Sequence, residues 1–222
     1  MTDEHTNPIL RGVQRQLDGC ATFFFDAFTS LNVNGISGDY VEFGSWGGNT
    51  LNAAYRQLIG SGGGRHMWAF DSFQGLPPAA DERDRHPGWQ PGSPFGQGGV
   101  EKFHEGCDAH GIPRDAYTAV EGYYDDVLPG LGSDQGPTDI ALAYIDCNMY
   151  SSTVTVLEFL APRLKHGMIV AFDDWFCWSP TGVSGEKEAL REFQEAHPQW
   201  NFDRYKDVHR SGVSFVVEGR HA

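Results

Sequence analysis

The stretch VEFGSWGGNT, residues 41–50, decides the fold that the sequence predicts. It combines the end of an apolar strand, a turn that contains three glycines and the first residues of a helix. Glycine lets such a turn adopt positive φ and brings the backbone close to a ligand. The G-x-x-G-G spacing differs from the G-x-G-x-x-G spacing of dinucleotide-binding turns. We therefore expect a strand–turn–helix unit that binds a cofactor other than a dinucleotide.

Two acidic residues indicate which cofactor this unit would hold. Glu42 precedes the first glycine, where its carboxylate would repel a pyrophosphate but suits a cofactor with an α-amino group. The next strand ends in Asp71, 27 residues beyond Gly44. A carboxylate at that strand end can accept hydrogen bonds from both ribose hydroxyls. Together these features favour S-adenosylmethionine, whereas the turn alone could be an ordinary tight connection.

Strands and helices alternate along the rest of the chain, which predicts an α/β fold with a mainly parallel, doubly wound sheet. The runs IALAYI (140–145) and MIVAF (168–172) are apolar throughout, as expected of strands buried on both faces. Further strands are expected at 38–44, 66–70, 117–121, 201–205 and 213–218, and helices at 12–31, 50–58, 153–164 and 185–197. Asn49 or Thr50 is the expected N-cap of the helix at 50–58.

The length of 222 residues suits one domain, which we expect to span residues 1–222 with a helical lead-in over 1–37. Residues 74–105 interrupt the alternation with five prolines and six glycines. This segment is too long for a plain connector, so we interpret it as a lid insertion over the site. The alternative is a mobile insertion that packs elsewhere.

Composition excludes several classes of partner. No stretch of about 18 apolar residues is present, and the acidic N-terminus lacks the pattern of a secretory signal, so we expect a cytoplasmic protein. The formal charge of −14 disfavours nucleic acid and anionic membranes as partners. The four cysteines form no C-x-x-C pair and are expected to be reduced thiols. The sequence leaves the oligomeric state open, with a homo-oligomer among the options.

Three carboxylates follow two neighbouring strands. Asp146 comes after the strand at 140–145, and Asp173 and Asp174 come after the strand at 168–172. Ligands of doubly wound sheets bind beyond the carboxyl ends of the strands, where these groups would converge. Such a cluster needs a cation to offset its repulsion, and all-oxygen ligation favours Mg²⁺, or Mn²⁺. The alternative is that Asp173 or Asp174 caps the segment that follows.

With these residues in view, the chain resembles the macrocin O-methyltransferase (TylF/MycF-type) family of sugar O-methyltransferases, which act on macrolides and novobiocin-type antibiotics. The resemblance runs from about Gly38 to Val217. It is carried by VEFGSWGGNT (41–50), FDSFQGLPP (70–78), EGYYDDVLP (121–129), IDCNMYSST (145–153) and FDDW (172–175). The combination and order of these stretches are specific, although each alone is not.

The resemblance implies a class I S-adenosylmethionine-dependent methyltransferase fold, Rossmann-like, with a seven-stranded sheet, an antiparallel last strand and helices on both faces. It also implies that Asp146, Asp173 and Asp174 are metal ligands. One departure from the family pattern is Asn148, which stands where many members have the second aspartate of a D-x-D motif. An amide at this position adds no charge to the cluster.

The same resemblance implies how the cofactor would lie. Glu42 and Gly44 would hold its methionine end, Asp71 its ribose, and Gly122 and Tyr123 would lie near its adenine. The expected cofactor-binding set is completed by Ser45, Asn49, Thr50, Ser72 and Asp146.

Methyl transfer to a sugar hydroxyl also needs a base and an acceptor surface. Asp146 is the first candidate for the base because it would lie beside both metal and acceptor. His209 is the second, because an antiparallel last strand would place it on the catalytic side. Aromatic faces stack on the apolar faces of sugars. The residues expected to contact the acceptor are Tyr150, Trp175 and Trp178, with Trp89 and Phe95 of the lid as further stacking surfaces.

The function that follows is metal-dependent transfer of a methyl group from S-adenosylmethionine to a hydroxyl of a sugar or glycoside. A catechol or other phenol is the alternative acceptor, since it would use a similar carboxylate cluster. A nucleotide-dependent oxidoreductase is a further alternative, which Glu42 and the G-x-x-G-G spacing disfavour. A non-catalytic scaffold would not need three convergent aspartates.

Overall fold

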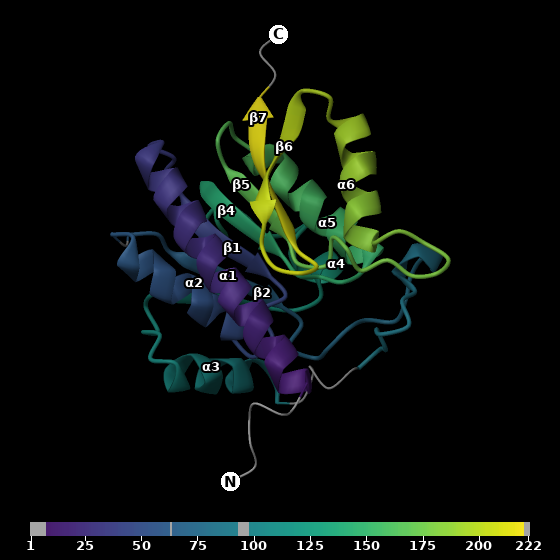
Figure 1. The fold of residues 1–222 in the computed structure, drawn as a ribbon, viewed down its shortest axis with the longest axis horizontal. Coiled ribbons are helices and arrows are strands. Elements are labelled where there is room, and N and C mark those ends of the chain that lie inside the picture. Colours follow the sequence, from purple (N-terminus) through teal and green to yellow (C-terminus); the bar gives the residue numbers. More distant parts are fainter. Residues whose placement is uncertain (1–7, 63, 93–97, 220–222) are drawn as a thin grey trace.

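Seven strands form one sheet in the order β3-β2-β1-β4-β5-β7-β6 (Figure 1). The structure is a computed structural model that describes residues 8–62, 64–92 and 98–219. The strands are β1 (Asp39–Phe43), β2 (Met67–Asp71), β3 (Tyr117–Glu121), β4 (Ile140–Ile145), β5 (Ile169–Phe172), β6 (Trp200–Asp207) and β7 (Val213–Gly219). Strands β1 to β5 pair in parallel, whereas β7 is antiparallel to both β5 and β6. This confirms the predicted sheet with its antiparallel last strand.

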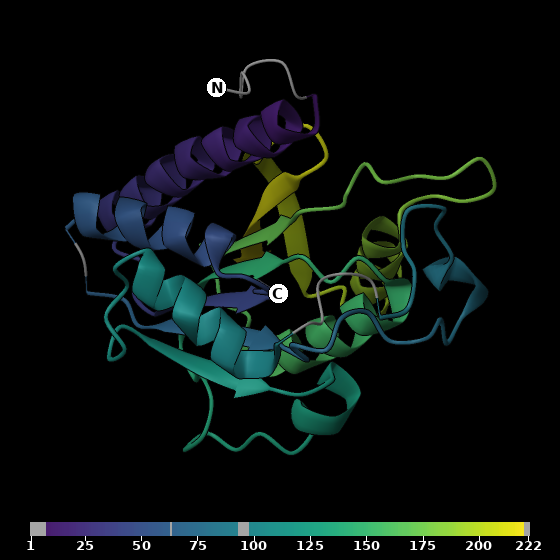
Figure 2. The same ribbon diagram turned by 90° about the horizontal axis from the view of Figure 1, so that it is seen from below.

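Helices cover both faces of the sheet (Figure 2). They are α1 (Pro8–Val33), α2 (Asn49–Gly60), α3 (Gly99–Ala109), α4 (Tyr124–Val127), α5 (Tyr150–Leu160) and α6 (Gly185–Ala196), with 3₁₀ turns at Glu82–Asp84 and Ala161–Arg163. Helices α1, α2 and α3 share one core with the sheet, and α5 and α6 share the other. No helix in the described part of the chain is both long and apolar enough to cross a membrane.

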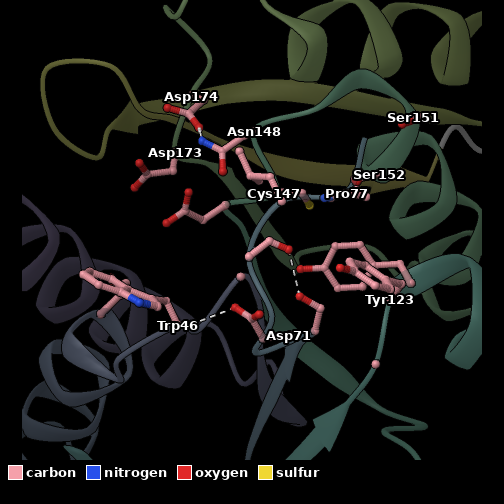
Figure 3. A pocket seen from close by; sticks show the side chains of 18 of the residues that line it. Trp46, Asp71, Pro77, Tyr123, Cys147, Asn148, Ser151, Ser152, Asp173 and Asp174 are labelled. Carbon is pink, nitrogen blue, oxygen red and sulfur yellow. Dashed lines mark hydrogen bonds between the residues drawn. The ribbon is translucent and has the colours of Figure 1, made fainter. Parts of the chain in front are cut away.

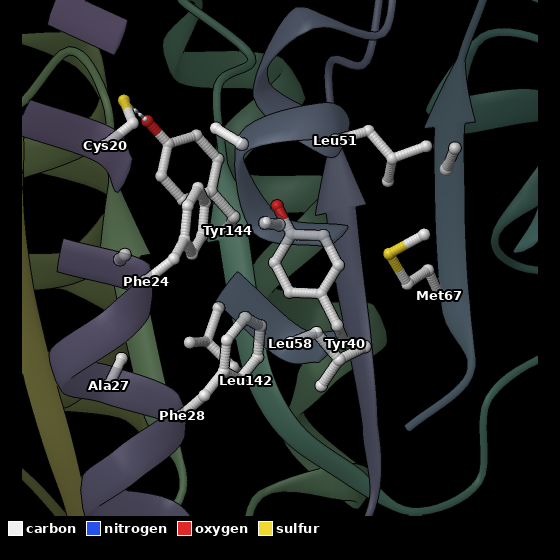
Figure 4. Close-up of a cluster of buried hydrophobic side chains, with 14 of the residues drawn as sticks. Cys20, Phe24, Ala27, Phe28, Tyr40, Leu51, Leu58, Met67, Leu142 and Tyr144 are labelled. Atoms are coloured by element: carbon white, nitrogen blue, oxygen red, sulfur yellow. Dashed lines mark hydrogen bonds between the residues drawn. The ribbon is translucent and has the colours of Figure 1, made fainter. Parts of the chain in front are cut away.

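Aromatic residues fill the core under α1. Phe24 and Phe28 of that helix pack against the ring of Tyr40, with ring centroids 5.6 and 6.0 Å away (Figure 4). Tyr40 on β1 and Tyr144 on β4 are fully buried. Burial of each such ring stabilises the fold by roughly 1.5–3 kcal/mol. The alternation of side chains along each strand sends neighbouring residues to opposite faces, so that Tyr144 lies in this core while Ile145 lies in the other.

One local prediction was wrong, and a helix begins inside the predicted insertion. Neither Asn49 nor Thr50 caps α2, because the N-cap is Gly48, which has φ +75° and no side chain to accept a hydrogen bond. Residues 99–105, at the end of the predicted insertion, lie in α3. That helix buries Phe103 and Cys107, one turn apart, against the core. Its glycine-rich start concealed it in the sequence.

The chain order places the site. Strand order reverses between β1 and β4, since β2 and β3 extend the sheet on one side and β5 on the other. Ligands of such sheets bind at this switch point, beyond the carboxyl ends of the strands. The turn after β1 and the residues after β4 and β5 all lie there.

Candidate active site

A cavity of about 490 Å³ opens at the carboxyl ends of the central strands (Figure 3). Ten of the predicted site residues line it: Gly44, Asn49, Thr50, Asp71, Ser72, Gly122, Tyr123, Asp146, Asp173 and Asp174. The sequence had not predicted that α1 would contribute Val13, Gln16 and Leu17 to the same wall. Trp46 of the glycine turn also lines the cavity. The contribution of α1 depends on the fold, because no sequence motif in that helix predicts it.

Gly44 follows β1 and lies beside Asp146, the first residue after the parallel strand β4. Its φ is +98°, and a Cβ there would lie 2.0 Å from the carbonyl oxygen of Asp146. Two backbone hydrogen bonds hold this arrangement. Gly44 N donates to Phe70 O of β2 at 2.8 Å, and Asp146 N donates to Phe43 O of β1 at 2.8 Å. The turn and Asp146 are therefore fixed relative to each other.

Asp71 ties the glycine turn to the loop after β2. Its carboxylate accepts hydrogen bonds from Trp46 N at 2.8 Å and from Phe73 N at 2.7 Å. Burial raises the pKa of this carboxyl, and the backbone donors oppose the rise. Asp71 thus orders the edge of the cavity while its side chain still faces the cavity.

Glu42 lies beneath the turn and is fully buried. Tyr40 donates a hydrogen bond from its hydroxyl to Oε2 at 2.5 Å. The other oxygen, Oε1, and the buried hydroxyl of Ser45 have no hydrogen-bond partner among the described residues. Burial raises the pKa of Glu42 to about 8. Neither residue lines the cavity directly, yet both leave polar atoms that require a partner.

Replacing Glu42 with glutamine should change how stability depends on pH in the cofactor-free protein. The folded-state pKa of about 8 lies above the ordinary 4.5, so the buried acid contributes stability below pH 4.5 that is lost as the pH rises through 8. Glutamine carries no charge. The Tm of Glu42→Gln minus that of the wild type should therefore grow from pH 5 to pH 8 and then level off, as followed by circular dichroism. A pH-independent difference would contradict this pKa.

Asp146, Asp173 and Asp174 form a compact carboxylate cluster. One oxygen of each lies within 4.8 Å of the others. Burial raises the pKa of Asp146 well above its ordinary value, and repulsion from the two neighbours adds to the rise. Burial, followed by repulsion from Asp173, raises the pKa of Asp174 to about 6. Within the described ranges, no lysine or arginine forms an ion pair with any of the three.

This donor set fits a hard divalent cation. Three close carboxylates repel one another unless a cation lies between them, and oxygen ligands of this kind suit Mg²⁺ or Mn²⁺. Asn148, which stands in the place of a fourth carboxylate, donates a hydrogen bond from Nδ2 to Asp174 Oδ2 at 2.6 Å. It orients a member of the cluster without adding charge.

Comparison with known proteins agrees with this geometry. The model of the macrocin-O-methyltransferase (TylF) family matches residues 21–202. The chain belongs to this family. The prediction of that family from the sequence motifs is confirmed.

Two curated relatives of this TylF-family protein are named as O-methyltransferases. The 8-demethyl-8-(2,3-dimethoxy-alpha-L-rhamnosyl)-tetracenomycin-C 4'-O-methyltransferase of Streptomyces olivaceus is 30% identical over 64% of this chain and 54% of its own length. The mycinamicin III 3''-O-methyltransferase of Micromonospora griseorubida is 28% identical over 81% of this chain and 68% of its own length. The match thus spans about half of the first relative and two thirds of the second.

Solved structures of O-methyltransferases share the fold. The O-methyltransferase NovP superposes with a TM-score of 0.68 at 21% identity, over 91% of this chain and 80% of NovP. The calicheamicin methyltransferase CalS11 superposes with a TM-score of 0.70 at 23% identity, over 97% of this chain and 85% of CalS11. The TylF-family chain therefore has the class I S-adenosylmethionine-dependent methyltransferase fold, as predicted.

His209 lies behind the carboxylate cluster of this TylF-family member. Its Nε2 is 2.6 Å from Asp173 Oδ1, and only 3% of its side chain is exposed. Tyr144 donates its hydroxyl hydrogen to the same oxygen, and Gln16 donates from Nε2 to Oδ2 at 3.2 Å. His209 does not line the cavity, so the geometry favours Asp146 over His209 as the base.

Sequence reasoning missed Glu186, a fully buried carboxylate next to the cluster of the TylF-family chain. It lies in the first turn of α6 and accepts a hydrogen bond from Asp174 N at 2.8 Å. Burial raises its pKa well above the ordinary value. In the sequence it is an ordinary acidic residue near a helix start, and only the packing of α6 brings it to the cluster.

The three predicted acceptor contacts of the TylF-family chain receive no support from its structure. Trp175 packs between Phe172 and Phe215, with ring centroids 5.4 and 4.9 Å away. The hydroxyl of Tyr150 donates to Glu192 at 2.5 Å. Trp178 is 66% exposed. None of Tyr150, Trp175 and Trp178 lines a cavity at the site.

A second cavity, of about 560 Å³, adjoins the first in this TylF-family protein, because Leu76 and Pro77 line both. It lies between the segment after β2 and the loop before α6. Its walls consist of Leu76, Pro77, Ala79, Asp84, Arg85, His86, Pro87, Trp89, Gln90, Pro91, Met149, Ser179, Pro180 and Thr181. The rings of His86 and Trp89 lie 4.3 Å apart. Phe95, the other predicted stacking residue, lies outside the described residues.

Proposed function

We propose that this protein is a metal-dependent O-methyltransferase that moves a methyl group from S-adenosylmethionine to a hydroxyl of a glycoside. One observation carries the proposal, namely that a glycine-rich cofactor turn and three convergent carboxylates share a single cavity. Membership of the macrocin-O-methyltransferase family supports the same reading.

The residues around the glycine turn fit S-adenosylmethionine, which supplies the methyl group when bound. The unpartnered oxygen of Glu42 and the hydroxyl of Ser45 would accept and donate hydrogen bonds at its amino-acid end, directly or through a water. A cationic amino group beside Glu42 would lower the pKa of that residue and favour its carboxylate. Asp71 would take the ribose, and Gly122 and Tyr123 would border the adenine. The remaining positions of the proposed set are Gly44, Asn49, Thr50, Ser72 and Asp146.

Asp146, Asp173 and Asp174 would hold the divalent cation, whose chemistry makes a coordinated hydroxyl more acidic. Asp173 is already oriented by His209, Tyr144 and Gln16. Such supporting hydrogen bonds fix the direction of a carboxylate ligand and spare it a loss of side-chain freedom on binding. The insertion after β2 and the lead-in helix α1 complete the surroundings, and we propose both as parts of one catalytic domain.

Asp146 is the proposed base. It follows β4 directly, lines the cavity and belongs to the cluster. A sugar hydroxyl must lose its proton as its oxygen takes the methyl group, and a carboxylate within hydrogen-bond reach can accept that proton. A cation bound at the cluster would lower the pKa of Asp146 and keep it ionised, as a proton acceptor must be.

The second cavity is the proposed place for the acceptor. It is continuous with the first at Leu76 and Pro77, and it presents the face of Trp89 together with several prolines. Flat apolar surfaces of this kind suit sugar rings and the apolar groups attached to them. The relative from Streptomyces olivaceus is named for a rhamnosyl-bearing substrate, which supports a carbohydrate over a phenol.

A methyl-transfer assay tests the proposal. Purified protein, Mg²⁺ and S-adenosylmethionine with a labelled methyl group are incubated with rhamnosides, macrolide glycosides, nucleotide sugars, catechols and simple phenols. We expect labelled product from at least one glycoside and none from the phenols. Turnover of catechols with no methylated carbohydrate would replace the proposed acceptor class with a phenol. No product from any acceptor, with cofactor binding shown by calorimetry, would refute the O-methyltransferase proposal for these classes.

A further inference from the structure

Asp84 is a buried carboxylate in the segment between β2 and α3, and no motif singled it out. It is 2% exposed and ends the 3₁₀ turn Glu82–Asp84. Four groups donate hydrogen bonds to it: Ala80 N at 2.9 Å, Asp81 N at 2.8 Å, Ser151 N at 2.8 Å and Ser151 Oγ at 3.0 Å. Oδ2 accepts three of these hydrogen bonds and Oδ1 accepts one, so most of the roughly four acceptor positions of the carboxylate are used.

The four donors come from two parts of the chain. Ala80 and Asp81 belong to the same segment as Asp84, whereas Ser151 lies in the first turn of α5. That turn begins four residues after Asp146, the proposed base. Asp84 therefore joins the segment after β2 to helix α5, which begins shortly after Asp146.

Arg83 strengthens the same junction from the outside. Its guanidinium pairs with Asp81 at 2.9 Å and with Glu192 of α6 at 2.7 Å, and it lies 3.6 Å from the ring centroid of Tyr150. The contacts are partly exposed, so each ion pair alone contributes little. They nevertheless attach the segment to α5 and α6 in the same place as Asp84.

The junction lies between the two cavities. Asp84 lines the second cavity, Ser151 lines the first, and Leu76 and Pro77 line both. The wall that the acceptor would touch, from Leu76 to Pro91, is thus attached at its middle to α5. A segment attached in this way is a fixed surface and not a flap that is hinged at both ends.

We propose that Asp84 is a positioning residue that fixes the wall over residues 76–91 in register with Asp146, so that the second cavity is a preformed subsite for the acceptor. The occupant is the apolar group attached to the reacting sugar ring, because prolines, Trp89 and Met149 dominate the cavity. The identity of the occupant rests on the proposed function. The attachment of the wall does not.

Asp84→Asn tests the proposal with almost no change in volume. The amide replaces one acceptor oxygen with a donor, which then faces backbone and hydroxyl donors. Leaving such buried donors unpaired weakens the attachment of the segment. We expect hydrogen exchange at the amides of Ala80, Asp81 and Ser151 to accelerate about tenfold or more, at the rate set by this local opening. Exchange in β1 and β4, and affinity for S-adenosylhomocysteine, should stay within about twofold of wild type.

The kinetic arm separates positioning from general loss of structure. The acceptors are 2-naphthyl α-L-rhamnopyranoside, which has a large apolar group, and methyl α-L-rhamnopyranoside, which lacks one. In Asp84→Asn, KM for the naphthyl glycoside should rise about tenfold while kcat changes little, because a wall that must be ordered again on binding weakens ground-state and transition-state binding alike. KM for the methyl glycoside should hardly change.

Two further variants serve as a control and as an independent test. Glu82→Gln is the matched control, since Glu82 is exposed and its change should leave every readout at the wild-type value. Ser151→Ala removes only the hydroxyl donor and should shift exchange in the same direction by a smaller factor, even if Asp84→Asn fails to fold. Unchanged exchange in Ser151→Ala and in folded Asp84→Asn would overturn the proposal. So would accelerated exchange with equal KM changes for both glycosides. If wild type methylates neither glycoside, the rhamnoside acceptor fails while exchange still decides whether Asp84 fixes the wall.

Discussion

Replacing Asp146 with asparagine should lower kcat for methyl transfer by roughly a thousandfold, the range in which removal of a general base falls. Asparagine keeps the volume of the side chain but cannot take a proton from the acceptor hydroxyl. It also removes a charge from the three-carboxylate cluster, so binding of the divalent cation should weaken. The assay uses labelled S-adenosylmethionine at saturating Mg²⁺, so that loss of the base is separated from loss of metal.

Asp139→Asn is the matched control for that variant. Asp139 immediately precedes β4, so it lies at the amino-terminal end of that strand, away from the cavity. It is exposed and forms an ion pair with Lys165. Its change should leave kcat at the wild-type value. If Asp146→Asn kept kcat within tenfold of wild type while remaining folded, Asp146 would be neither the base nor an essential ligand. A parallel His209→Ala variant with the larger loss would transfer the role of base to the histidine.

The second large effect concerns the glycine turn. Gly44→Ala should destabilise the cofactor-free protein by roughly 3–5 kcal/mol, at the upper end of what single substitutions do. The new Cβ would lie 2.0 Å from the carbonyl oxygen of Asp146, and the φ of +98° would strain any side chain. Neither strand can move aside, because β1 and β4 pair with each other and with further strands. Thermal unfolding should show a fall in Tm on the order of 10 °C.

Gly47→Ala, three residues along, provides the comparison. Its Cβ would meet nothing within 4 Å, and its φ lies outside the left-handed range. We expect its Tm to stay near that of wild type, since such substitutions change stability by about 0.5 kcal/mol or less. An equal fall in Tm for the two variants would mean that the turn tolerates no side chain at either position. The contact of the new Cβ with the Asp146 carbonyl oxygen would then not be the cause.

Much of this architecture could be predicted from the sequence because it depends on local patterns. The apolar run at 140–145 and the one that ends at Phe172 identified β4 and β5. The carboxylates after them then had to meet, because parallel strands end at the same edge of the sheet. The glycine spacing after β1 identified the cofactor turn for the same reason. All three signals combine a strand end with the residue that follows it.

The rest depends on contacts between distant parts of the chain. Gln16 reaches Asp173 across 157 residues of sequence, and no motif in α1 indicates that contact. Trp175 follows β5 and its two aspartates, as an acceptor contact would, yet its ring packs against Phe215 on β7. The sequence order could not reveal which side of the loop its ring would take. Asp84 lies in a segment of turn-forming residues, where an aspartate is common, and only the approach of α5 makes it distinctive.

Removal and return of the divalent cation test the central claim most directly. The protein is treated with EDTA and dialysed until metal analysis shows negligible Mg²⁺ and Mn²⁺, and methyl transfer from labelled S-adenosylmethionine is measured with a glycoside acceptor identified in the panel. The cluster of Asp146, Asp173 and Asp174 predicts that activity falls to the background of the assay and returns when Mg²⁺ is added. Full activity in the metal-free protein would contradict the account, because the three carboxylates would then need no cation for catalysis.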